Sequence, residues 1–423
     1  MWPFRKRNIF AGLAESFGSS FTLIKTPRHK ICLKGELQRQ SVMMFYDPTS
    51  KVQKYPLLTI ITPSEAFPLG ISLCKVDSFS KALKSAGFHF LRTGDRWLDE
   101  IMFADGLSQL AIALFDSKSR RAIKKLSDNN HNNLFIENSQ IKIETPHHLV
   151  KKDYLERIIR LAVGLSTHLI RPGSFRDLLM INFLRDDLEL VKKRNLEVLV
   201  RYFKQDPKVQ TLLKQALTDN NVAVRIEAAR GLGKIGIPYL EEIMLNDDEP
   251  HASQALSALR TIKNQHIIPV LEKALHRNTL AQKAAQTLGE LRAEDSIEAL
   301  LHLFHQTDPL TKLTVIKACG DIGSAKANHF LLQQLEQTNL ALIIFALTAL
   351  GKCGAVSTVE PLYNYKKKMT SRKLKVATRR AISAIQTRLG RSETGWLSMV
   401  HDEESQGALS LPTHPYEGAL SSE

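Results

Sequence analysis

The sequence has few cysteines and none of the spacings that usually accompany cysteine chemistry. Its four cysteines are spread over 423 residues, and no pair forms a Cys-x-x-Cys motif of the zinc or redox type. Cysteines placed in this way predict reduced thiols in a cytoplasmic protein, because reducing compartments keep thiols unpaired. The four are Cys32, Cys74, Cys319 and Cys353.

Long hydrophobic runs are also missing. A membrane-spanning helix needs about 20 mostly apolar residues, and the most apolar stretch, 57–74, is interrupted by Pro63, Glu65 and Pro68. We therefore expect no transmembrane segment. Residues 1–19 are expected to form a flexible basic N-terminus, and the alternative is peripheral contact with an anionic membrane. The aromatic residues for that contact would be Trp2, Phe4 and Phe10.

No catalytic constellation is recognisable. The sequence has no P-loop, no zinc-ligand spacing and no nucleophile with a matching base and orienting group. Thr93-Gly94-Asp95, followed by Asp99 and Glu100, is an acidic cluster beside a tight turn, which ordinary turn chemistry explains. His147 and His148 lack further ligands at metal-binding spacing. We expect a chain that is not an enzyme and holds neither a metal nor a cofactor.

What the sequence does contain is a repeat. Residues 206–390 repeat with a period of about thirty, and related segments end each unit. The third positions of these segments follow one another at steps of 27, 29, 31, 31 and 32. A period in this range is typical of a helical solenoid. These positions are Gly233, Arg260, Gly289, Gly320, Gly351 and Ser383.

Each repeat is predicted to be a pair of helices joined by a polar turn. In the first unit, 209–217 and 222–235 carry apolar residues at helical spacing. Gly236 is expected to end the second helix as a C-cap. Small residues such as Gly289 and Gly320 are expected to let neighbouring helices approach closely. The turn residues expected to cap the second helices are Asn221, Asp248, Asn278, Asp308, Asn339 and Ser371.

The repeat resembles HEAT repeats, particularly the short bacterial type also found in phycobilisome lyases. The resemblance covers residues 206–390, about six repeats, and is carried by the period, the paired helices, the Asp/Asn turn and the Leu-Gly-x-Ile-Gly ending. It implies a superhelical α-solenoid that binds a partner protein on its concave face. No lyase-specific residues are identifiable. The His-Glu pairs with which some HEAT-like enzymes bind iron are also absent.

The first repeat also spells Gly-x-Gly-x-x-Gly at Gly231, Gly233 and Gly236. In a dinucleotide-binding fold this motif follows a strand and opens a helix. Here a helical pattern precedes it and Pro238 follows. Helix packing is therefore the better interpretation.

The region before the repeat has a different pattern. Residues 20–150 show short runs rich in β-branched and aromatic residues, which predict strands. A helix is expected over 107–126, so the fold class is α+β. Residues 151–205 are expected to be connecting helices, one over 152–170 and one over 175–203. The predicted strands are Phe21–Lys25, Lys30–Lys34, Val42–Tyr46, Leu57–Ile61, Phe88–Leu91, Leu134–Ile136 and Gln140–Glu144.

The formal net charge of +15 is unevenly distributed. The repeat body 206–356 carries −1, whereas the terminal unit 357–391 carries +9. A groove wrapped on nucleic acid would be basic over several repeats, because neutralised phosphates supply the affinity. The basic cluster of the terminal repeat is either a patch for an anionic partner or a solvated end cap. Its residues are Lys366, Lys367, Lys368, Arg372, Lys373, Lys375, Arg379 and Arg380.

The C-terminal segment 391–423 is expected to be a disordered acidic tail. Residues 392–423 carry −6, and the tail contains Gly-x-Leu-Ser three times, at 395–398, 407–410 and 418–421. Each copy is either a short docking motif or a coincidence in a polar segment. The docking residues would be Trp396, Leu397, Leu409 and Leu420.

Together these features predict a non-enzymatic scaffold that binds a protein partner through a HEAT-like solenoid. One alternative is a nucleic-acid-associated protein that uses the basic terminal repeat. Another is a lyase-like or other enzyme with its site in the N-terminal domain.

Overall fold

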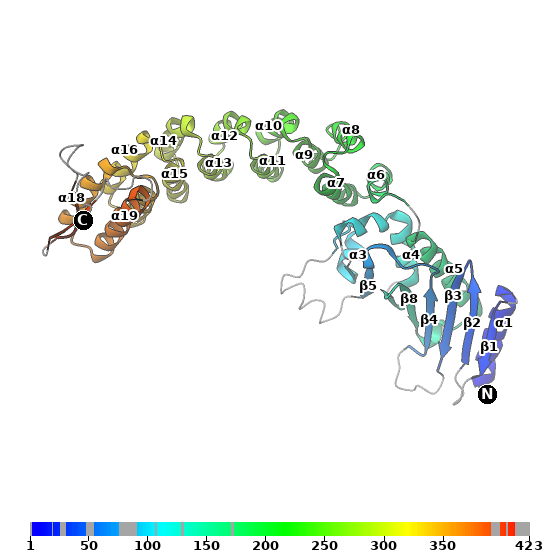
Figure 1. Ribbon diagram of the computed structural model, residues 1–423. Coiled ribbons are helices and arrows are strands. Elements are labelled where there is room, and N and C mark those ends of the chain that lie inside the picture. Colours follow the sequence, from blue (N-terminus) through cyan, green and yellow to red (C-terminus); the bar gives the residue numbers. More distant parts are fainter. Residues whose placement is uncertain are drawn as a thin grey trace, which may run out of the picture. The chain divides into compact units, whose positions relative to one another are not determined.

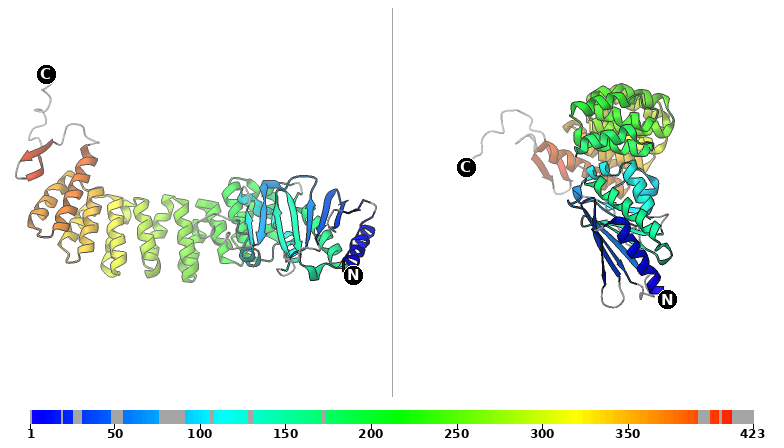
Figure 2. Two further views of the ribbon diagram at one scale, coloured as in Figure 1. Left: turned by 90° about the horizontal axis from the view of Figure 1, so that it is seen from below. Right: turned by 90° about the vertical axis from the view of Figure 1, so that its right-hand side faces the viewer.

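The computed structural model describes most of the chain and divides it into two compact units, Met1–Gly231 and Leu232–Glu423 (Figures 1 and 2). The described residues are 2–18, 20–25, 31–47, 55–75, 91–105, 108–127, 131–170, 173–390, 398–402 and 405–410.

The first unit contains an antiparallel sheet that has eight strands within the described residues, in the order β1-β2-β3-β4-β8-β7-β5-β6. Alternation along the strands sends one set of side chains into the core, so that Val42 faces Ile61 and Ile61 faces Ile141 across the sheet. The strands are β1 Thr22–Lys25, β2 Ile31–Leu37, β3 Gln40–Tyr46, β4 Leu57–Thr62, β5 Ser72–Lys75, β6 Met102–Asp105, β7 Asn133–Glu137 and β8 Gln140–Thr145.

The helices α1 Trp2–Phe17, α4 Ser117–Ser127 and α5 Lys152–Leu169 pack against this sheet. α5 contacts β4, while α1 and α4 pack on either side of α5 (Figures 1 and 2). A side chain from the sheet fixes α5, because Nε2 of Gln40 donates to Oγ1 of Thr167 at 2.6 Å. The short helices α3 Arg96–Ile101, η2 Pro68–Gly70, η3 Gln109–Leu114 and η4 His147–Leu149 complete this part.

Most of the strands predicted between residues 21 and 144 are present. Residues 88–90 of the predicted strand Phe88–Leu91 lie outside the described residues. β5 and β6 were not predicted. The single helix predicted over 107–126 is wrong: η3 ends at Leu114, and Oδ1 of Asp116 accepts from the amide of Ser119 to start α4.

The N-terminal residues are helical rather than flexible. α1 has its Phe10 and Leu13 side chains completely buried, and the rings of Phe10 and Tyr46 lie 5.7 Å apart. Phe10 therefore cannot reach a membrane as the peripheral-contact alternative requires. The side chains of Trp2 and Phe4 are outside the described residues.

Further helices follow α5 in the first unit. The single helix predicted over 175–203 is two helices, α6 Phe175–Arg185 and α7 Glu189–Phe203, which pack on each other. They are separated by a turn at Asp186, whose backbone is extended and whose carboxylate accepts from the amide of Leu188 at 3.0 Å. α8 Pro207–Ala216 and α9 Val222–Leu232 follow.

The second unit is a series of helix pairs. One row consists of α11, α13, α15, α17 and α19, and successive members of this row pack directly on one another. Figure 1 shows this row on the inner side of the curve that the second unit follows. The helices are α10 Ile237–Asn246, α11 Glu249–Ile262, α12 Ile268–Ala274, α13 Asn278–Glu290, α14 Ile297–Gln306, α15 Pro309–Ile322, α16 Ala325–Gln333, α17 Leu340–Cys353, α18 Val359–Lys368 and α19 Arg372–Gly390. Short 3-10 turns, η5 Gly233–Gly236, η6 Gln265–Ile267, η7 Glu294–Ser296, η8 Gln334–Glu336 and η9 Val356–Thr358, join them.

Glycine sets the spacing of the inner row. A Cβ at Gly289 would lie 2.8 Å from Cα of Ala318, and one at Gly320 would lie 2.6 Å from Cβ of Ala349. Both approaches are closer than real side chains tolerate, so the predicted packing role of these glycines is confirmed. Their cost in helix propensity, about 1 kcal/mol each, is offset by this close contact.

Side-chain caps start most of the second helices, as predicted. Asn221, Asp248, Asp308 and Asn339 each accept from an amide in the first turn that follows. Asn278 was predicted wrongly, because α13 begins one residue earlier and Arg277 occupies the cap position without a side-chain cap bond. For Ser371 the structure gives the backbone bond from the amide of Lys375.

The C-cap predicted at Gly236 is also wrong. Gly236 has right-handed helical backbone angles, while Gly233 has φ +61° and marks the end of α9. The left-handed position falls at Gly233 because glycine adopts positive φ without steric cost.

The neutral body of the repeat has a structural basis in pairing between successive repeats. On the inner row Arg260 pairs with Glu290 at 2.6 Å and Lys352 pairs with Asp321 at 2.9 Å. On the other row Lys273 pairs with Glu241 and Lys326 pairs with Glu298. Each exposed pair is worth only about 0–1 kcal/mol, and the near-zero net charge of the body follows from its 15 basic and 16 acidic residues.

In the C-terminal tail the structure describes two short strands, β9 Ser398–Asp402 and β10 Ser405–Ser410. They pair antiparallel, with Leu409 opposite Met399. The other tail positions lie outside the described residues.

Candidate binding groove in the last repeats

A groove of about 920 Å³ lies between α17 and α19, the last two helices of the inner row. Its size falls within the usual range for ligand sites. The side chains of both helices line it at helical spacing. On α17 these include Ile344, Thr348 and Lys352, each four residues after the last.

Small residues hold the two helices close enough to form the floor. A Cβ at Gly351 would lie 3.2 Å from Cα of Ala381 and 3.4 Å from Cβ of Ala384. Larger side chains at these positions would separate the helices. Leu347 and Val376 add apolar surface, and Val376 remains 39% exposed.

The rim of the groove is positively charged. Lys352, Arg372, Lys373 and Arg380 line it, and no acidic side chain does so among the described residues. Lys352 is held by Asp321 of the preceding repeat, whereas the three residues of α19 have no ion-pair partner in the part of the chain that is described. The groove therefore combines an apolar floor with unbalanced positive charge.

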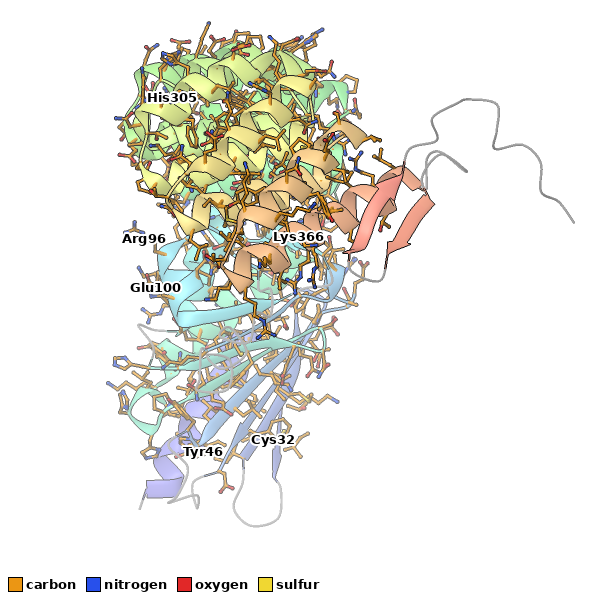
Figure 3. The ribbon with its side chains drawn as sticks, turned by 90° about the vertical axis from the view of Figure 1, so that its left-hand side faces the viewer. Cys32, Tyr46, Arg96, Glu100, His305 and Lys366 are labelled. Atoms are coloured by element: carbon orange, nitrogen blue, oxygen red, sulfur yellow. The ribbon has the colours of Figure 1, made fainter. Side chains whose placement is uncertain are left out.

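The structure divides the predicted basic cluster between different surfaces. Arg372, Lys373 and Arg380 line the groove, whereas Lys375 and Arg379 are exposed on α19 outside its lining. The other three, Lys366, Lys367 and Lys368, belong to the last turn of α18, where positive charge favours a helix C-terminus. Figure 3 labels Lys366.

Lys366 and Lys367 share an aromatic neighbour. Their ammonium groups lie 5.6 and 4.6 Å from the ring centroid of Tyr363, which is cation–π geometry. The phenol of Tyr365 on the same helix has its pKa raised by burial. α18 thus carries two lysines stacked over a tyrosine ring, and these residues do not line the groove.

Of the predicted tail residues, Leu409 lies in β10. Trp396, Leu397 and Leu420 lie outside the described residues. Nothing in the described contacts brings the tail residues together with the groove.

The apolar half of the groove was not predicted from the sequence. Ile344, Leu347 and Val376 follow ordinary helical spacing, which predicts core positions. Lys352 lies outside the basic run that the charge count selected. The groove is formed by one face of each of two helices. Predicting it requires knowing which helices are neighbours.

The acidic cluster near residue 95 is a local cap. The Asp99 carboxylate accepts from the amide and the hydroxyl of Thr93, both at 2.8 Å, and from the amide of Gly94 at 2.9 Å. Asp99 lies in the first turn of α3. His147 Nδ1 lies 3.3 Å from the hydroxyl of Tyr46. No cluster of three or more potential metal ligands occurs in the described chain.

Among the described residues, no helix is both long enough and apolar enough to cross a membrane.

Comparison with known proteins identifies the helical part of the chain. Residues 178–260 and 268–351 match the family model of HEAT repeats. The match begins in α6, within residues 151–205, which were expected to be connecting helices. No curated protein matches the chain.

Three solved structures show similarity at low identity. The complex of CpcE and CpcF of phycocyanin lyase from Nostoc sp. PCC7120 is 19% identical, with a TM-score of 0.31, and covers 51% of this chain and 96% of that one. An engineered protein is 17% identical, with a TM-score of 0.35, and covers 66% and 83%. A second engineered protein is also 17% identical, with a TM-score of 0.27, and covers 51% and 98%. On the family match, residues 178–351 of the chain are HEAT repeats.

Proposed function

We propose that this protein is a non-enzymatic scaffold that binds an acidic, partly apolar segment of a partner protein. The observation that carries the proposal is the groove between α17 and α19, which joins an apolar floor to a rim of four cations without an acidic lining residue. HEAT repeats supply extended surfaces for partners. The groove would be the anchor point on that surface, because buried apolar contacts give most of the affinity and charge gives selectivity.

The charge distribution supports a protein partner over a nucleic acid wrapped along the repeats. The body 206–356 carries −1, and four of its cations pair with carboxylates of neighbouring repeats. Nucleic-acid affinity depends on many phosphate contacts. One basic end would provide few of them.

A test compares two kinds of substitution on the same helix. In Val376→Asp and Arg380→Glu the groove loses apolar surface or changes charge, while Lys375→Glu makes the same charge change outside the lining. Partners captured by the native chain would be identified, purified and titrated against each variant. We expect at least about tenfold weaker binding for the groove variants and little change for Lys375→Glu. Equal affinity for all variants would exclude the groove as the anchor.

The acidic tail provides an internal check on the same proposal. A synthetic peptide of residues 391–423, titrated against the chain ending at Gly390, should bind more weakly when Arg380 is replaced by Glu. If the tail competes for the groove, removing it should raise affinity for the external partner. A tail peptide that binds equally well to native chain and Arg380→Glu variant would exclude the tail as a groove ligand.

A second candidate function is binding of single-stranded nucleic acid at α18. The observation favouring it is the placement of Lys366 and Lys367 over the Tyr363 ring, because cations and aromatic rings together bind phosphates and bases. Low-salt binding of a labelled RNA or DNA strand should fall in Lys366→Gln/Lys367→Gln and stay unchanged in Lys375→Gln. Undetectable binding to the native chain at low salt would exclude this function.

A further inference from the structure

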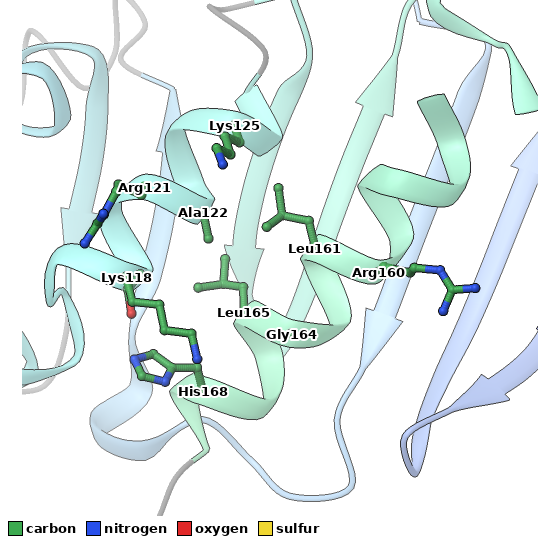
Figure 4. Close-up of a pocket in the computed structure, with 10 residues that line it drawn as sticks. Lys118, Arg121, Ala122, Lys125, Arg160, Leu161, Gly164, Leu165 and His168 are labelled. Atoms are coloured by element: carbon green, nitrogen blue, oxygen red, sulfur yellow. The ribbon is translucent and has the colours of Figure 1, made fainter. Parts of the chain in front are cut away.

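A second cavity lies in the α+β part of the chain, within the first unit. It has a volume of about 500 Å³ and is formed between α4 and α5. Ala122, Leu161 and Leu165 give it an apolar lining (Figure 4). This volume suits a small organic ligand.

Cations surround the cavity. Lys118, Arg121 and Lys125 project from one face of α4, since residues three, four and seven apart share a helical face. Arg160 and His168 come from α5, and Figure 4 shows Lys118 reaching towards His168. No acidic side chain lines this cavity among the described residues.

Two of the cations are free to serve a ligand. Lys118 and Lys125 are exposed and have no ion-pair partner within the described residues. Arg121 is held by the hydroxyl and carbonyl of Ser117, and Arg160 pairs with Glu156 at 2.9 Å.

Asp116 is the carboxylate at the start of α4, and both its oxygens are in use. Oδ1 accepts from the amide of Ser119 at 2.8 Å, while Oδ2 lies 2.8 Å from Nε2 of His168. Within the described residues, neither Lys118 nor Lys125 forms an ion pair with this carboxylate.

Gly164 is the feature that distinguishes this cavity from an ordinary basic surface. It lies inside α5, where glycine lowers helix stability relative to alanine, and it lines the cavity. A Cβ added at Gly164 would meet no atom within 4 Å. Unlike Gly289 and Gly320, it is required neither by close helix packing nor by a positive φ. The glycine keeps an opening beside the α5 backbone.

We propose that this cavity binds the phosphate monoester group of a small organic molecule. Lys118 and Lys125 would contact the dianion, as lysine commonly does for phosphate. Ala122, Leu161 and Leu165 would contact the organic part, and the opening at Gly164 would admit it. The site belongs to the α+β domain and does not depend on the function proposed for the repeats.

Calorimetric titration of the full chain with phenyl phosphate tests the proposal. Lys118→Gln and Lys125→Gln should each weaken binding by about tenfold, because each removes a charge-assisted contact. Lys124→Gln is the matched control: it neutralises the neighbouring residue on α4, which lies over the Trp97 ring and does not line the cavity. Gly164→Ala should raise the melting temperature of the free chain and yet weaken binding.

The source of the phosphate is decided by a second probe. Phosphatidylcholine vesicles with and without phosphatidic acid would be compared with phenyl phosphate. Binding of phenyl phosphate indicates a soluble ester, and binding confined to the phosphatidic acid vesicles indicates a lipid headgroup. In either case the proposal requires that Lys118→Gln and Lys125→Gln weaken the binding.

Three results would overturn the proposal. One is the absence of binding to either probe at low salt. Another is equal weakening by Lys124→Gln and Lys125→Gln, which would indicate a nonspecific effect of charge. The third is a Gly164→Ala variant that is more stable but binds phenyl phosphate as tightly as the native chain.

Discussion

Arg120 and Asp186 form a buried ion pair that links the α+β domain to the first HEAT helices. Nη2 of Arg120 lies 2.9 Å from Oδ1 of Asp186, and the two side chains are 5% and 2% exposed. Nε of Arg120 also pairs with Asp95 at 3.0 Å, and Nη1 donates to the carbonyl of Phe115 at 2.8 Å. One guanidinium therefore joins α4, the loop before α3 and the turn between α6 and α7.

Replacing Arg120 should destabilise the first unit strongly. Arg120→Met leaves two carboxylates without their cation, and breaking a buried pair in this way costs about 3–5 kcal/mol. Urea unfolding, followed by circular dichroism, would measure the change. The control is Arg121→Met, an exposed neighbour on the same helix, for which we expect a change within about 0.5 kcal/mol. Equal effects from both substitutions would contradict a structural role for the buried pair.

The sequence predicted local features well and long-range ones poorly. The caps at Asp308 and Asn339 were predictable because a capping side chain bonds to amides two or three residues ahead. The Arg120–Asp186 pair was not, since the two residues are separated by 66 positions. Nothing local distinguishes Arg120 from Arg121, although one is buried and the other exposed.

Glycine in the inner row should be intolerant of even one added methyl group. In Gly320→Ala the new Cβ would lie 2.6 Å from Cβ of Ala349, so α15 and α17 must separate. Overpacking of this kind typically costs about 1–3 kcal/mol. Gly164→Ala is the matched control, because its Cβ meets open space and alanine favours the helix by up to about 1 kcal/mol. Thermal unfolding of both variants should shift in opposite directions; a stabilised Gly320→Ala would contradict the packing.

The candidate groove shows why the site was only half predictable. Composition alone identified Arg372, Lys373 and Arg380 as part of a basic terminal repeat. The apolar floor depends on the pairing of α17 with α19. Gly351 and Ala381 are small enough to allow this pairing, but their positions in the sequence do not predict it. The charge could be predicted because it is obtained by counting residues along the sequence. The cavity could not, because it forms only where two particular helices pack together.

Glu227 should make stability depend on pH. Burial raises the pKa of its carboxyl, although the neighbouring Arg230 guanidinium acts in the opposite direction. The folded state therefore holds the proton more tightly than the unfolded state. The stability that Glu227 contributes is fully present below its ordinary pKa of 4.5 and is lost as pH rises through the raised value.

The Glu227→Gln variant isolates that contribution. The unfolding free energy of the native chain minus that of the variant should fall from mildly acidic to neutral pH. Denaturant unfolding over this range measures the difference, with Glu249→Gln as an exposed control on another helix. A difference that is independent of pH would contradict the burial effect on Glu227.

Cys319 and Cys353 should react very slowly with thiol reagents while the chain is folded. Burial raises the pKa of Cys319 to about 12 and that of Cys353 to about 11. The thiolate is the reactive form, and a thiol of pKa about 11 ionises about 300-fold less at neutral pH than one near 8.5. Cys319→Ser and Cys353→Ser, each in a Cys32→Ala/Cys74→Ala background, would leave one thiol to follow with an aromatic disulfide reagent. Both should react slowly when folded and at ordinary rates in guanidinium chloride. Fast labelling of the native chain would mean that the helix pairs α15 and α17 open far more often than their packing predicts.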